Sequence, residues 1–520
     1  MSVAADSRTD VVIVGGGHNG LVAAGYLARA GRRVCVLERL DHVGGAAVSA
    51  YAFDGVDARL SRYSYLVSLL PQRIIDDLGV RVRLVRRRWS SYTPDPASGG
   101  RTGLLVGPAS TFAAVGAAGD EAGFDEFYRR CNTVTSRIWP TLTEPLRNRS
   151  DLRLAVGGGP DEEWAWRALV DQPIGDAITS AVRNDLVRGV MATDALIGTY
   201  AALDDSSLQQ NVCFLYHLIG GGTGDWDVPV GGMGAVSGAL AAAAAGFGAD
   251  IRTGAEVESI TPDGEVRYCQ DGVQHRVVAD HVLANVTPTV LARLLGEDAP
   301  DSAPGAQVKV NLMLRRLPRL RDDSVTVEQA FGGTFHINET YSQLESAYRR
   351  AAEGAVPEPL PCEIYCHSLA DPTILSDELR ASGAQTLTVF GLHTPHHLMT
   401  AGTPERLRDT LTSAVLTSLN SVLAEPIHDV LMEDAEGRLC IETKTTADLD
   451  DALGMTNGHI FHGALTWPFA EDDEPLSTPA QRWGVATAHE RIMLCGSGSR
   501  RGGAVSGIGG HNAAMAVLDR

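Results

Sequence analysis

Six consecutive residues near the start of the chain could hold the phosphates of a dinucleotide. The segment Gly15-Gly16-Gly17-His18-Asn19-Gly20 contains the pattern GxGxxG. The first glycine of this pattern makes a tight turn, the second lets a pyrophosphate approach the backbone, and the third lets a helix and a strand pack closely. The pattern alone is weak evidence, because glycine-rich turns are common. The secondary structure predicted around the pattern must show whether it is a dinucleotide site.

The flanking residues place this turn between a strand and a helix. Asp10–Val14 is a short apolar run that predicts a strand, Leu21–Ala30 has helical spacing of apolar residues, and Val34–Leu37 predicts a second strand. The free N–H groups at the start of the helix would then point at the phosphates. Glu38 ends the second strand, where a carboxylate can accept both ribose hydroxyls and repel a 2′-phosphate. FAD or NAD is therefore favoured over NADP.

A second glycine pair separates FAD from NAD. Gly44 and Gly45 follow soon after Glu38 and Arg39, and a second glycine turn at this place is typical of large flavoproteins, although a plain loop turn is an equal alternative for the pair alone. This segment predicts FAD as the cofactor. Its predicted binding residues are Val14, Gly15, Gly16, Gly17, His18, Asn19, Gly20, Glu38, Arg39, Gly44, Gly45, Ala46 and Ala47.

Charge and composition argue against several other functions. A net charge of −20 repels nucleic-acid phosphates and anionic lipid surfaces, so we expect no nucleic-acid partner. The eight cysteines are scattered, without the spacing of a redox or zinc motif. Three histidines, at positions 393, 396 and 397, are interrupted by Pro395, which breaks any helix that would align them. We expect no metal site.

The sequence also predicts where the protein resides. It contains no run of about 18 uncharged apolar residues, so we expect no transmembrane segment. The first ten residues carry Asp6, Arg8 and Asp10 and lead into the strand pattern, which fits neither a secretory nor a transit peptide. We predict a cytoplasmic protein, and the sequence leaves a homo-oligomer open.

Seven segments, in the same order along nearly the whole chain, resemble the carotenoid/retinoid (phytoene desaturase-like) flavin oxidoreductases. Seven ordered matches are far more specific than one glycine turn. The segments are Val11–Leu27, Leu37–Val48, Ser61–Leu70, Ala192–Gly198, Pro229–Leu240, Gly458–Leu465 and Leu494–Ala514.

This resemblance implies that the flavin site has a second part. Val257 would offer backbone contacts to the adenine, and the loop 496–507 would lie under the isoalloxazine, with a helix starting at Val505 whose first N–H groups could bind the pyrimidine carbonyl. Arg500-Arg501 and His511 depart from the residues usual in the family, so we expect an altered substrate preference or flavin potential. The predicted residues of this part are Val257, Gly496, Ser497, Gly502, Gly503, Ala504, Val505 and Ser506.

The predicted fold class is α/β, with a Rossmann-like FAD-binding domain of the phytoene desaturase-like kind, an inserted α+β substrate domain and a helical cap. The FAD-binding domain is expected in three parts, interrupted by the other two units. The predicted boundaries are 1–110 for its first part, 111–224 for the mainly helical cap, 225–300 for its second part, 301–480 for the substrate domain and 481–520 for its third part.

The function favoured by these features is an FAD-dependent oxidoreductase of the dehydrogenase or desaturase type. The resemblance implies a hydrophobic, isoprenoid-like or acyl substrate that gives a hydride to flavin N5, with oxygen or a quinone among the acceptors left open. One alternative is an FAD amine oxidase, although no aromatic pair is evident near Trp467 or Trp483. The other alternative is a flavin-binding regulatory or interaction protein with little turnover.

Three residues are candidates for the base that removes the proton. His462, Tyr63 and His511 have side chains that can exchange one. Each has an ordinary alternative, respectively as a packed histidine, an aromatic wall residue and a helix-surface residue. The arginine-rich stretch 81–88 predicts the solvated side of a strand, with an anionic-substrate patch as its alternative.

Overall fold

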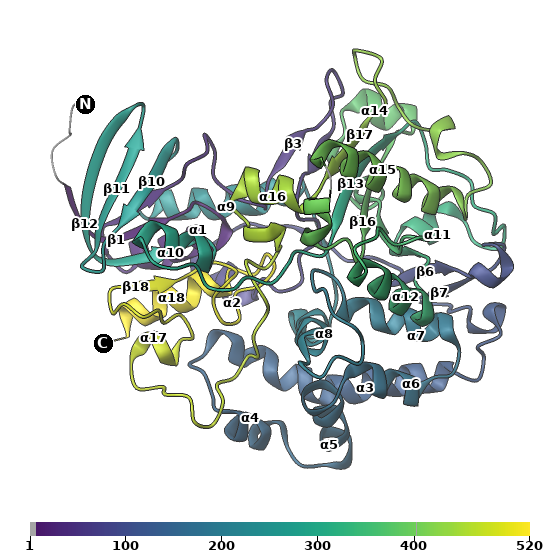
Figure 1. The fold of residues 1–520 in the computed structure, drawn as a ribbon, viewed down its shortest axis with the longest axis horizontal. Helices are drawn as coiled ribbons and strands as arrows, with labels where there is room; N and C mark the ends of the chain where they lie inside the picture. The colour runs from purple at the N-terminus through teal and green to yellow at the C-terminus, as the bar shows by residue number, and fades with distance from the viewer. Residues whose placement is uncertain (1–6, 402, 520) are drawn as a thin grey trace.

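The computed structural model describes residues 7–401 and 403–519, and within them the chain forms two seven-stranded sheets (Figure 1). The first sheet combines segments from both ends of the described chain and from its middle. Its strand order is β10-β11-β12-β1-β2-β9, with β18 beside β12. The strands are β10 (Ala255–Ile260), β11 (Glu265–Gln270), β12 (Val273–Ala284), β1 (Ser7–Val14), β2 (Val34–Leu37), β9 (Asp250–Arg252) and β18 (Ile492–Leu494).

Four parallel strands of this sheet end at one edge. The register places Leu37, Val14, Ala284 and Leu494 side by side at the ends of β2, β1, β12 and β18. Ligands of open α/β sheets bind outside the carboxyl ends of the strands. The loops that begin at Glu38, Gly15, Asn285 and Cys495 therefore meet at the edge where a dinucleotide is expected.

Two helices pack closely on this sheet. Helix α1 (His18–Arg29) follows β1, and helix α18 (Ile508–Leu518) follows β18. A β-carbon added to Gly510 of α18 would lie 1.9 Å from the carbonyl oxygen of Asn19. Only glycine, which has no β-carbon, allows the chains to approach this closely, so the backbones of α1 and α18 are in direct contact at Gly510.

The second sheet contains most of the strands of the segment predicted as the substrate domain. Its strand order is β17-β13-β16-β15-β14-β6-β7, and helices α11 (Val327–Phe331), α12 (Tyr341–Ala352) and α15 (Pro404–Asn420) accompany it. Strands β6 and β7 come from the segment predicted as the first FAD-binding part, so that segment also contributes to this sheet. The strands are β17 (Ile441–Lys444), β13 (Val308–Leu314), β16 (Gln385–Gly391), β15 (Cys362–Tyr365), β14 (Thr334–Ile337), β6 (Ser91–Pro94) and β7 (Gly103–Val106).

A group of helices lies below the second sheet in Figure 1. It has its own apolar core, and this core also contains Phe461, Leu465 and Ile508 from the C-terminal part of the chain. The predicted helical segment 111–224 thus packs directly on residues that follow the last strand of the second sheet. The α-helices are α3 (Glu121–Ile138), α4 (Arg149–Val156), α5 (Pro160–Trp166), α6 (Ile174–Ala181), α7 (Asp185–Ala192) and α8 (Gln209–Ile219).

The predicted elements around the glycine turn are present, with different helix starts. Strand β2 has the predicted bounds, whereas α1 begins at His18 rather than Leu21. The final helix begins at Ile508, and the prediction of Val505 is wrong. Ala504 and Gly507 have φ of 58° and 71°, which are incompatible with a right-handed helix. The loop therefore runs three residues further than expected.

The helix contact gives a testable prediction. We expect Gly510→Ala to destabilise the protein by about 1–3 kcal/mol, because its methyl group would force α1 and α18 apart. Gly238→Ala is the matched control, since Gly238 is an exposed position in helix α9 (Met233–Gly246) with no atom within 4 Å of an added β-carbon. The control should gain about 0.5–1 kcal/mol. Thermal melting of the FAD-loaded variants measures both, and equal melting temperatures for the two would contradict the close contact.

Candidate cofactor and substrate site

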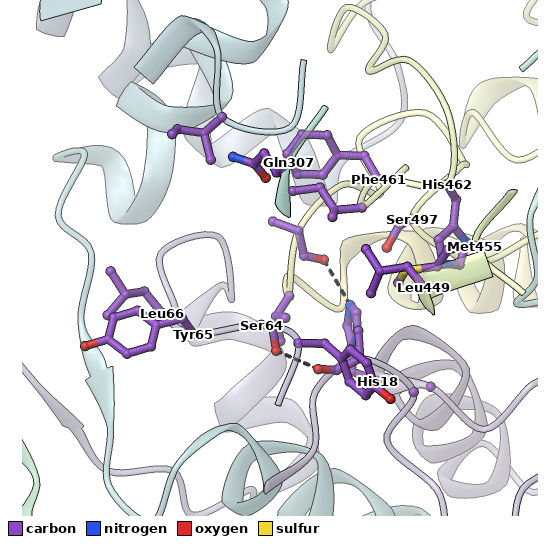
Figure 2. A pocket seen from close by; sticks show the side chains of 18 of the residues that line it. His18, Ser64, Tyr65, Leu66, Gln307, Leu449, Met455, Phe461, His462 and Ser497 are labelled. Atoms are coloured by element: carbon purple, nitrogen blue, oxygen red, sulfur yellow. Dashed lines mark hydrogen bonds between the residues drawn. The ribbon is translucent and has the colours of Figure 1, made fainter. Parts of the chain in front are cut away.

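One cavity of about 890 Å³ begins at the carboxyl edge of the first sheet and continues between the second sheet and the helices. Figure 2 shows His18, His462 and Ser497 toward one side of it and Tyr65 and Leu66 toward the other. Twelve residues predicted to bind FAD line its wall. They are Val14, Gly15, Gly17, His18, Glu38, Arg39, Gly45, Ala46, Val257, Ser497, Ala504 and Val505.

The other predicted cofactor residues are not in the wall. They support the loops that form it, and their assignment to FAD stays a prediction. They are Gly16, Asn19, Gly20, Gly44, Ala47, Gly496, Gly502, Gly503 and Ser506.

The first glycine turn has the crowding that its pattern predicts. Gly15 has φ of 100°, and a β-carbon on it would lie 2.7 Å from the carbonyl oxygen of Asn285. A β-carbon on Gly20 would lie 2.4 Å from the carbonyl oxygen of Gly15. Gly17 lines the cavity and precedes the first turn of α1, which has no side-chain cap. The N–H groups of that turn can therefore bind an anion.

The second glycine pair packs on the first. The N–H of Gly44 donates to the carbonyl oxygen of Gly16 at 2.9 Å. A β-carbon on Gly45 would lie 3.2 Å from the α-carbon of Gly17. Gly44 and Gly45 both have positive φ, at 121° and 57°. The pair therefore continues the cradle that the first turn begins.

Glu38 is held by the backbone that it helps to shape. Its Oε2 accepts a hydrogen bond from the N–H of Gly16 at 2.7 Å, and its Oε1 accepts one from the N–H of Leu40 at 2.9 Å. The side chain is 7% exposed and lines the cavity. Each carboxylate oxygen can accept a further hydrogen bond. Glu38 can therefore serve two ribose hydroxyls while it fixes the turn.

Asn285 is a site residue that the sequence motifs did not reveal. It directly follows β12, lines the cavity, and its Nδ2 donates to the carbonyl oxygen of Gly15 at 2.9 Å. β-Carbons added to Gly17, Gly20 or Gly496 would also meet its side chain. Its position at the end of a third parallel strand is the signal that could have identified it.

Two residues at the start of α1 hold the C-terminal loop against the glycine turn. The Nε2 of His18 lies 3.0 Å from the carbonyl oxygen of Ala504, and because a carbonyl only accepts, this nitrogen carries the proton. Burial lowers the pKa of His18 to about 4, so the ring is neutral. Asn19 Nδ2 lies 3.4 Å from both Ser497 Oγ and the carbonyl oxygen of Gly502. The two predicted parts of the flavin site are thus in direct contact.

Close packing, rather than a positive φ, explains the glycines at positions 502 and 503. Neither Gly502 nor Gly503 has positive φ, whereas Ala504 and Arg501 do. A β-carbon on Gly502 would lie 2.4 Å from the carbonyl oxygen of Gly496, and one on Gly503 would lie 2.4 Å from Leu465 Cδ2. Packing against the loop backbone therefore excludes a side chain at Gly502, whereas a side chain at Gly503 would require Leu465 to move.

The residues that depart from the family pattern point away from the cavity. Arg501 donates to the carbonyl oxygens of Thr141, Glu144 and Trp483 at 2.7–3.0 Å. His511 packs edge-on against Tyr26 and Trp483 and is fully buried. Arg500 pairs with Glu474. The expectation that these residues change substrate preference by facing the flavin ring is not supported, because none of the three lines the cavity.

Two of the three candidate bases face the cavity. His462 and Tyr63 line it, whereas His511 does not. Burial lowers the pKa of His462 to about 4, and its Nδ1 has no hydrogen-bond partner. Burial raises the pKa of Tyr63, so its phenol stays protonated. His462 can accept a proton at neutral pH, and Tyr63 can donate a hydrogen bond.

Two further cavity residues carry unpaired polar atoms. Gln307 is 5% exposed, and both its Nε2 and its Oε1 lack partners. Glu363 is 4% exposed; the hydroxyl of Tyr365 donates to its Oε1, while its Oε2 has no partner. Burial, followed by the charge of Asp194, raises the pKa of Glu363 to about 8. Buried polar atoms are normally hydrogen-bonded, so such atoms in a cavity wall indicate contacts with a bound molecule.

No cluster of three or more histidine, cysteine, aspartate or glutamate side chains in the described ranges 7–401 and 403–519 could hold a metal ion. Over the same ranges, none of the helices combines the length and the apolar character needed to cross a membrane.

Comparisons with known proteins identify related families and folds. The family model "NAD(P)-binding Rossmann-like domain" matches residues 13–71, and "Flavin containing amine oxidoreductase" matches residues 163–353. Uncharacterized protein Rv0897c of Mycobacterium tuberculosis is 66% identical over 523 residues, which cover 99% of this chain and 97% of that protein.

A more distant relative and a solved structure extend the likeness. Pyridine nucleotide-disulfide oxidoreductase domain-containing protein 2 of Rattus norvegicus is 28% identical over 573 residues, covering 98% of this chain and 93% of that protein. The seven segments resemble this protein, and the alignment confirms that resemblance. Cyclohexylamine oxidase from Brevibacterium oxydans shares the fold, with a TM-score of 0.55 at 15% identity over 98% of this chain and 100% of that one.

The contacts of Glu38 give a prediction about FAD affinity. Glu38→Gln should weaken FAD binding by about 1.5–3 kcal/mol for each hydrogen bond to the charged group that is lost. Because both oxygens already accept from backbone N–H groups, the amide nitrogen of glutamine would face one of those donors. We therefore expect Glu38→Gln to be nearly as harmful as Glu38→Ala. Asp41→Asn is the control, since Asp41 is almost fully exposed. Fluorescence titration with FAD measures the affinities, and a Glu38→Gln protein that binds like the Asp41 control would contradict this role.

The buried acid Glu363 predicts a pH-dependent stability. Because folding raises its pKa from 4.5 to about 8, its contribution is fully present below about pH 4.5 and is lost as the pH rises through 8. Relative to Glu363→Gln, the wild-type melting temperature should therefore fall between pH 5 and pH 9. Glu353→Gln changes an exposed glutamate and should show no such trend. Parallel profiles for wild type and Glu363→Gln would show that the acid does not titrate in this range.

Proposed function

The chain belongs to the protein family of its 66% identical mycobacterial relative, within the superfamily of flavin-containing amine oxidoreductases, and from this premise we propose that it dehydrogenates a largely apolar, isoprenoid-like or acyl substrate. It is an FAD-dependent oxidoreductase. The single observation that carries the proposal is the continuous cavity that joins the glycine cradle to an apolar wall between the second sheet and the helices.

The residues present fit FAD. The glycine cradle leaves room for a pyrophosphate, Glu38 retains acceptor capacity for a ribose, and the unpaired amide of Gln307 can both donate and accept. When bound, FAD supplies the acceptor of the substrate's hydride at flavin N5. We infer that Gly15, Gly17, Glu38, Asn285 and the C-terminal loop hold it.

Apolar side chains support an apolar substrate. They come from the segment 64–66, the helices, the second sheet, and the loops that contain Ile197, Ile460 and Phe461. Polar contacts beside an apolar wall of this kind are stronger than in water. The apolar wall residues are Leu66, Val106, Phe124, Val190, Ile197, Leu218, Phe390, Ile460 and Phe461.

His462 is the residue that we propose as proton acceptor. It is neutral, its Nδ1 is unpaired, and it lies against the glycine loop, where a β-carbon on Gly496 would be 3.3 Å from that nitrogen. Tyr63 is the residue that we propose to orient the substrate, because its protonated phenol lines the same cavity. A base positioned in a dry site contributes by geometry first and pKa second.

Oxidation of an amine is the second candidate, and one specific observation favours it. The rings of Tyr65 and Tyr365 lie 4.5 Å apart and both line the cavity, so an aromatic pair exists at a place that inspection around Trp467 and Trp483 missed. Aromatic faces attract cations. Anaerobic bleaching of the flavin by a polyene would support the proposed dehydrogenase. Bleaching by a primary amine but not by a polyene would instead support an amine oxidase. Bleaching by neither would favour a regulatory flavoprotein.

NADPH should be a poor reductant of this protein. The only glycine turn with a dinucleotide pattern is the one assigned to FAD, and Glu38 disfavours a 2′-phosphate. In stopped-flow mixing without oxygen, NADPH should leave the flavin absorbance unchanged for minutes, while dithionite bleaches it. Fast stoichiometric bleaching by NADPH without a partner protein would contradict the single-nucleotide site.

A further inference from the structure

We propose that the end of the cavity around Asp194 and Glu363 binds a positively charged nitrogen of the substrate, at a distance from the carbon that reacts. This inference rests on the proposed function, because it describes the other end of the same substrate. The group would be an ammonium carried on an apolar chain.

Two carboxyl groups face this end of the cavity without an ion pair in the described part of the chain, although the charge of Arg87 reaches both. Asp194 lies in a short 3-10 helix (Thr193–Ala195) and lines the cavity. Its carboxylate forms no hydrogen bond or ion pair with any residue in the described part of the chain. Glu363, on β15, receives a hydrogen bond on one oxygen only, and the other oxygen is buried without a partner. Both groups can therefore accept from a ligand.

A third carboxyl group lies behind the cavity wall and is coupled to Glu363. Glu339 is 1% exposed, and the Thr193 hydroxyl lies beside its carboxyl group. Burial, followed by the charge of Glu363, holds its pKa well above the ordinary range. Burial also raises the pKa of Asp194. A cation nearby would restore the ionised forms, so ligand and site would stabilise each other.

The cationic and imidazole groups around the site do not satisfy these carboxyls. Arg87 donates to the carbonyl oxygen of Trp226 and to Thr334 Oγ1, and within the described residues it has no carboxylate at ion-pair distance. Burial lowers the pKa of His336 to about 3, so it is neutral. His217 donates through Nδ1 to the carbonyl oxygen of Cys213, which leaves Nε2 as an acceptor in its neutral form.

The count of free donors and acceptors selects the ligand. Asp194, Glu363 Oε2 and His217 Nε2 offer acceptors, and Arg87 Nη2 is the unused cationic donor that we find beside them among the described groups. An ammonium has three donors and no acceptor, so it matches this set. The faces of Tyr65 and Trp226 line the same end and suit a cation. A carboxylate would instead lie among acidic groups with a single arginine to bind it.

An apolar stretch separates this site from the C-terminal loop. Asp194 precedes Ile197 by about one helical turn. A β-carbon on the next residue, Gly198, would lie 2.7 Å from atoms of Ile460 and Phe461. Phe461 in turn is 3.6 Å from the β-carbon position of Gly503. A chain anchored at Asp194 would therefore run along Ile197, Ile460 and Phe461 toward the glycine loop.

The test compares three probes that share one alkyl chain. Octylammonium, 1-octanol and octanoate are titrated into the FAD-loaded protein without oxygen, by calorimetry. We expect octylammonium to bind at least about tenfold more tightly than the other two, because hydrogen bonds to charged groups exceed neutral ones by this order. Tightest binding of octanoate would make Arg87 the anchor and overturn the proposal. Equal binding of all three would overturn it as well.

Variants locate the binding site. Asp194→Asn should weaken octylammonium binding at least about tenfold and change 1-octanol binding by less than about twofold. Asp125→Asn removes the same charge from another residue of the cavity wall that is exposed to solvent, and it should leave both affinities unchanged. Glu363→Gln removes the other carboxyl group of the site and can be used if Asp194→Asn does not fold. If Asp194→Asn and Glu363→Gln bind octylammonium as tightly as the Asp125→Asn control does, the proposed site is refuted.

Binding does not depend on turnover, so the two proposals fail separately. If the protein binds octylammonium through Asp194 but no substrate bleaches its flavin, the ammonium site is supported and the proposed reaction is refuted. If the protein dehydrogenates a polyene but binds the three probes equally, the proposed reaction is supported and the ammonium site is refuted.

Discussion

The site depends on the close approach of bare backbone at the carboxyl edge of the first sheet. Gly15, Gly17 and Gly20 each leave a space that a β-carbon would fill, and Asn285 lies against all three. The Gly44-Gly45 turn and the side chain of Glu38 then bind to the same backbone. If side chains stood at these positions, β1, β12 and α1 would have to separate, and the edge where four parallel strands end would lose its shape.

The same restriction extends to the C-terminal loop. His18 and Asn19 hold Ala504, Ser497 and Gly502, and Arg501 ties the loop to three carbonyl oxygens of the helical segment and of the region near residue 483. Arg501 is almost fully buried, so these hydrogen bonds offset a large loss of hydration. A cofactor site, a helical cap and the last strand are therefore coupled through one loop.

Sequence reasoning succeeded where the information is local. The strand, the glycine turn, α1 and Glu38 lie within a stretch of fewer than forty residues, and their order alone determines how they meet. Asn285 and Gln307 could not be identified in this way, because they reach the cavity only through strand pairing between distant segments. The start of α18 was misjudged because Ala504 adopts a positive φ that alanine rarely takes. Arg87 illustrates a different limit. The alternation of the arginine-rich stretch predicted a solvated strand, yet this one side chain lines the cavity.

The pairing of β12 with both β1 and β18 has a consequence for how the protein is made. His18 and Ala504 are separated by 486 positions, and β18 enters the first sheet after all the other described strands have been synthesised. Contacts of such long range form slowly, because the entropy of closing the intervening chain must be overcome first. During translation the N-terminal half of the sheet must therefore wait, with one edge and the glycine turn uncovered, until the last strand leaves the ribosome. Cells that make this protein have to keep that waiting edge from pairing with other chains.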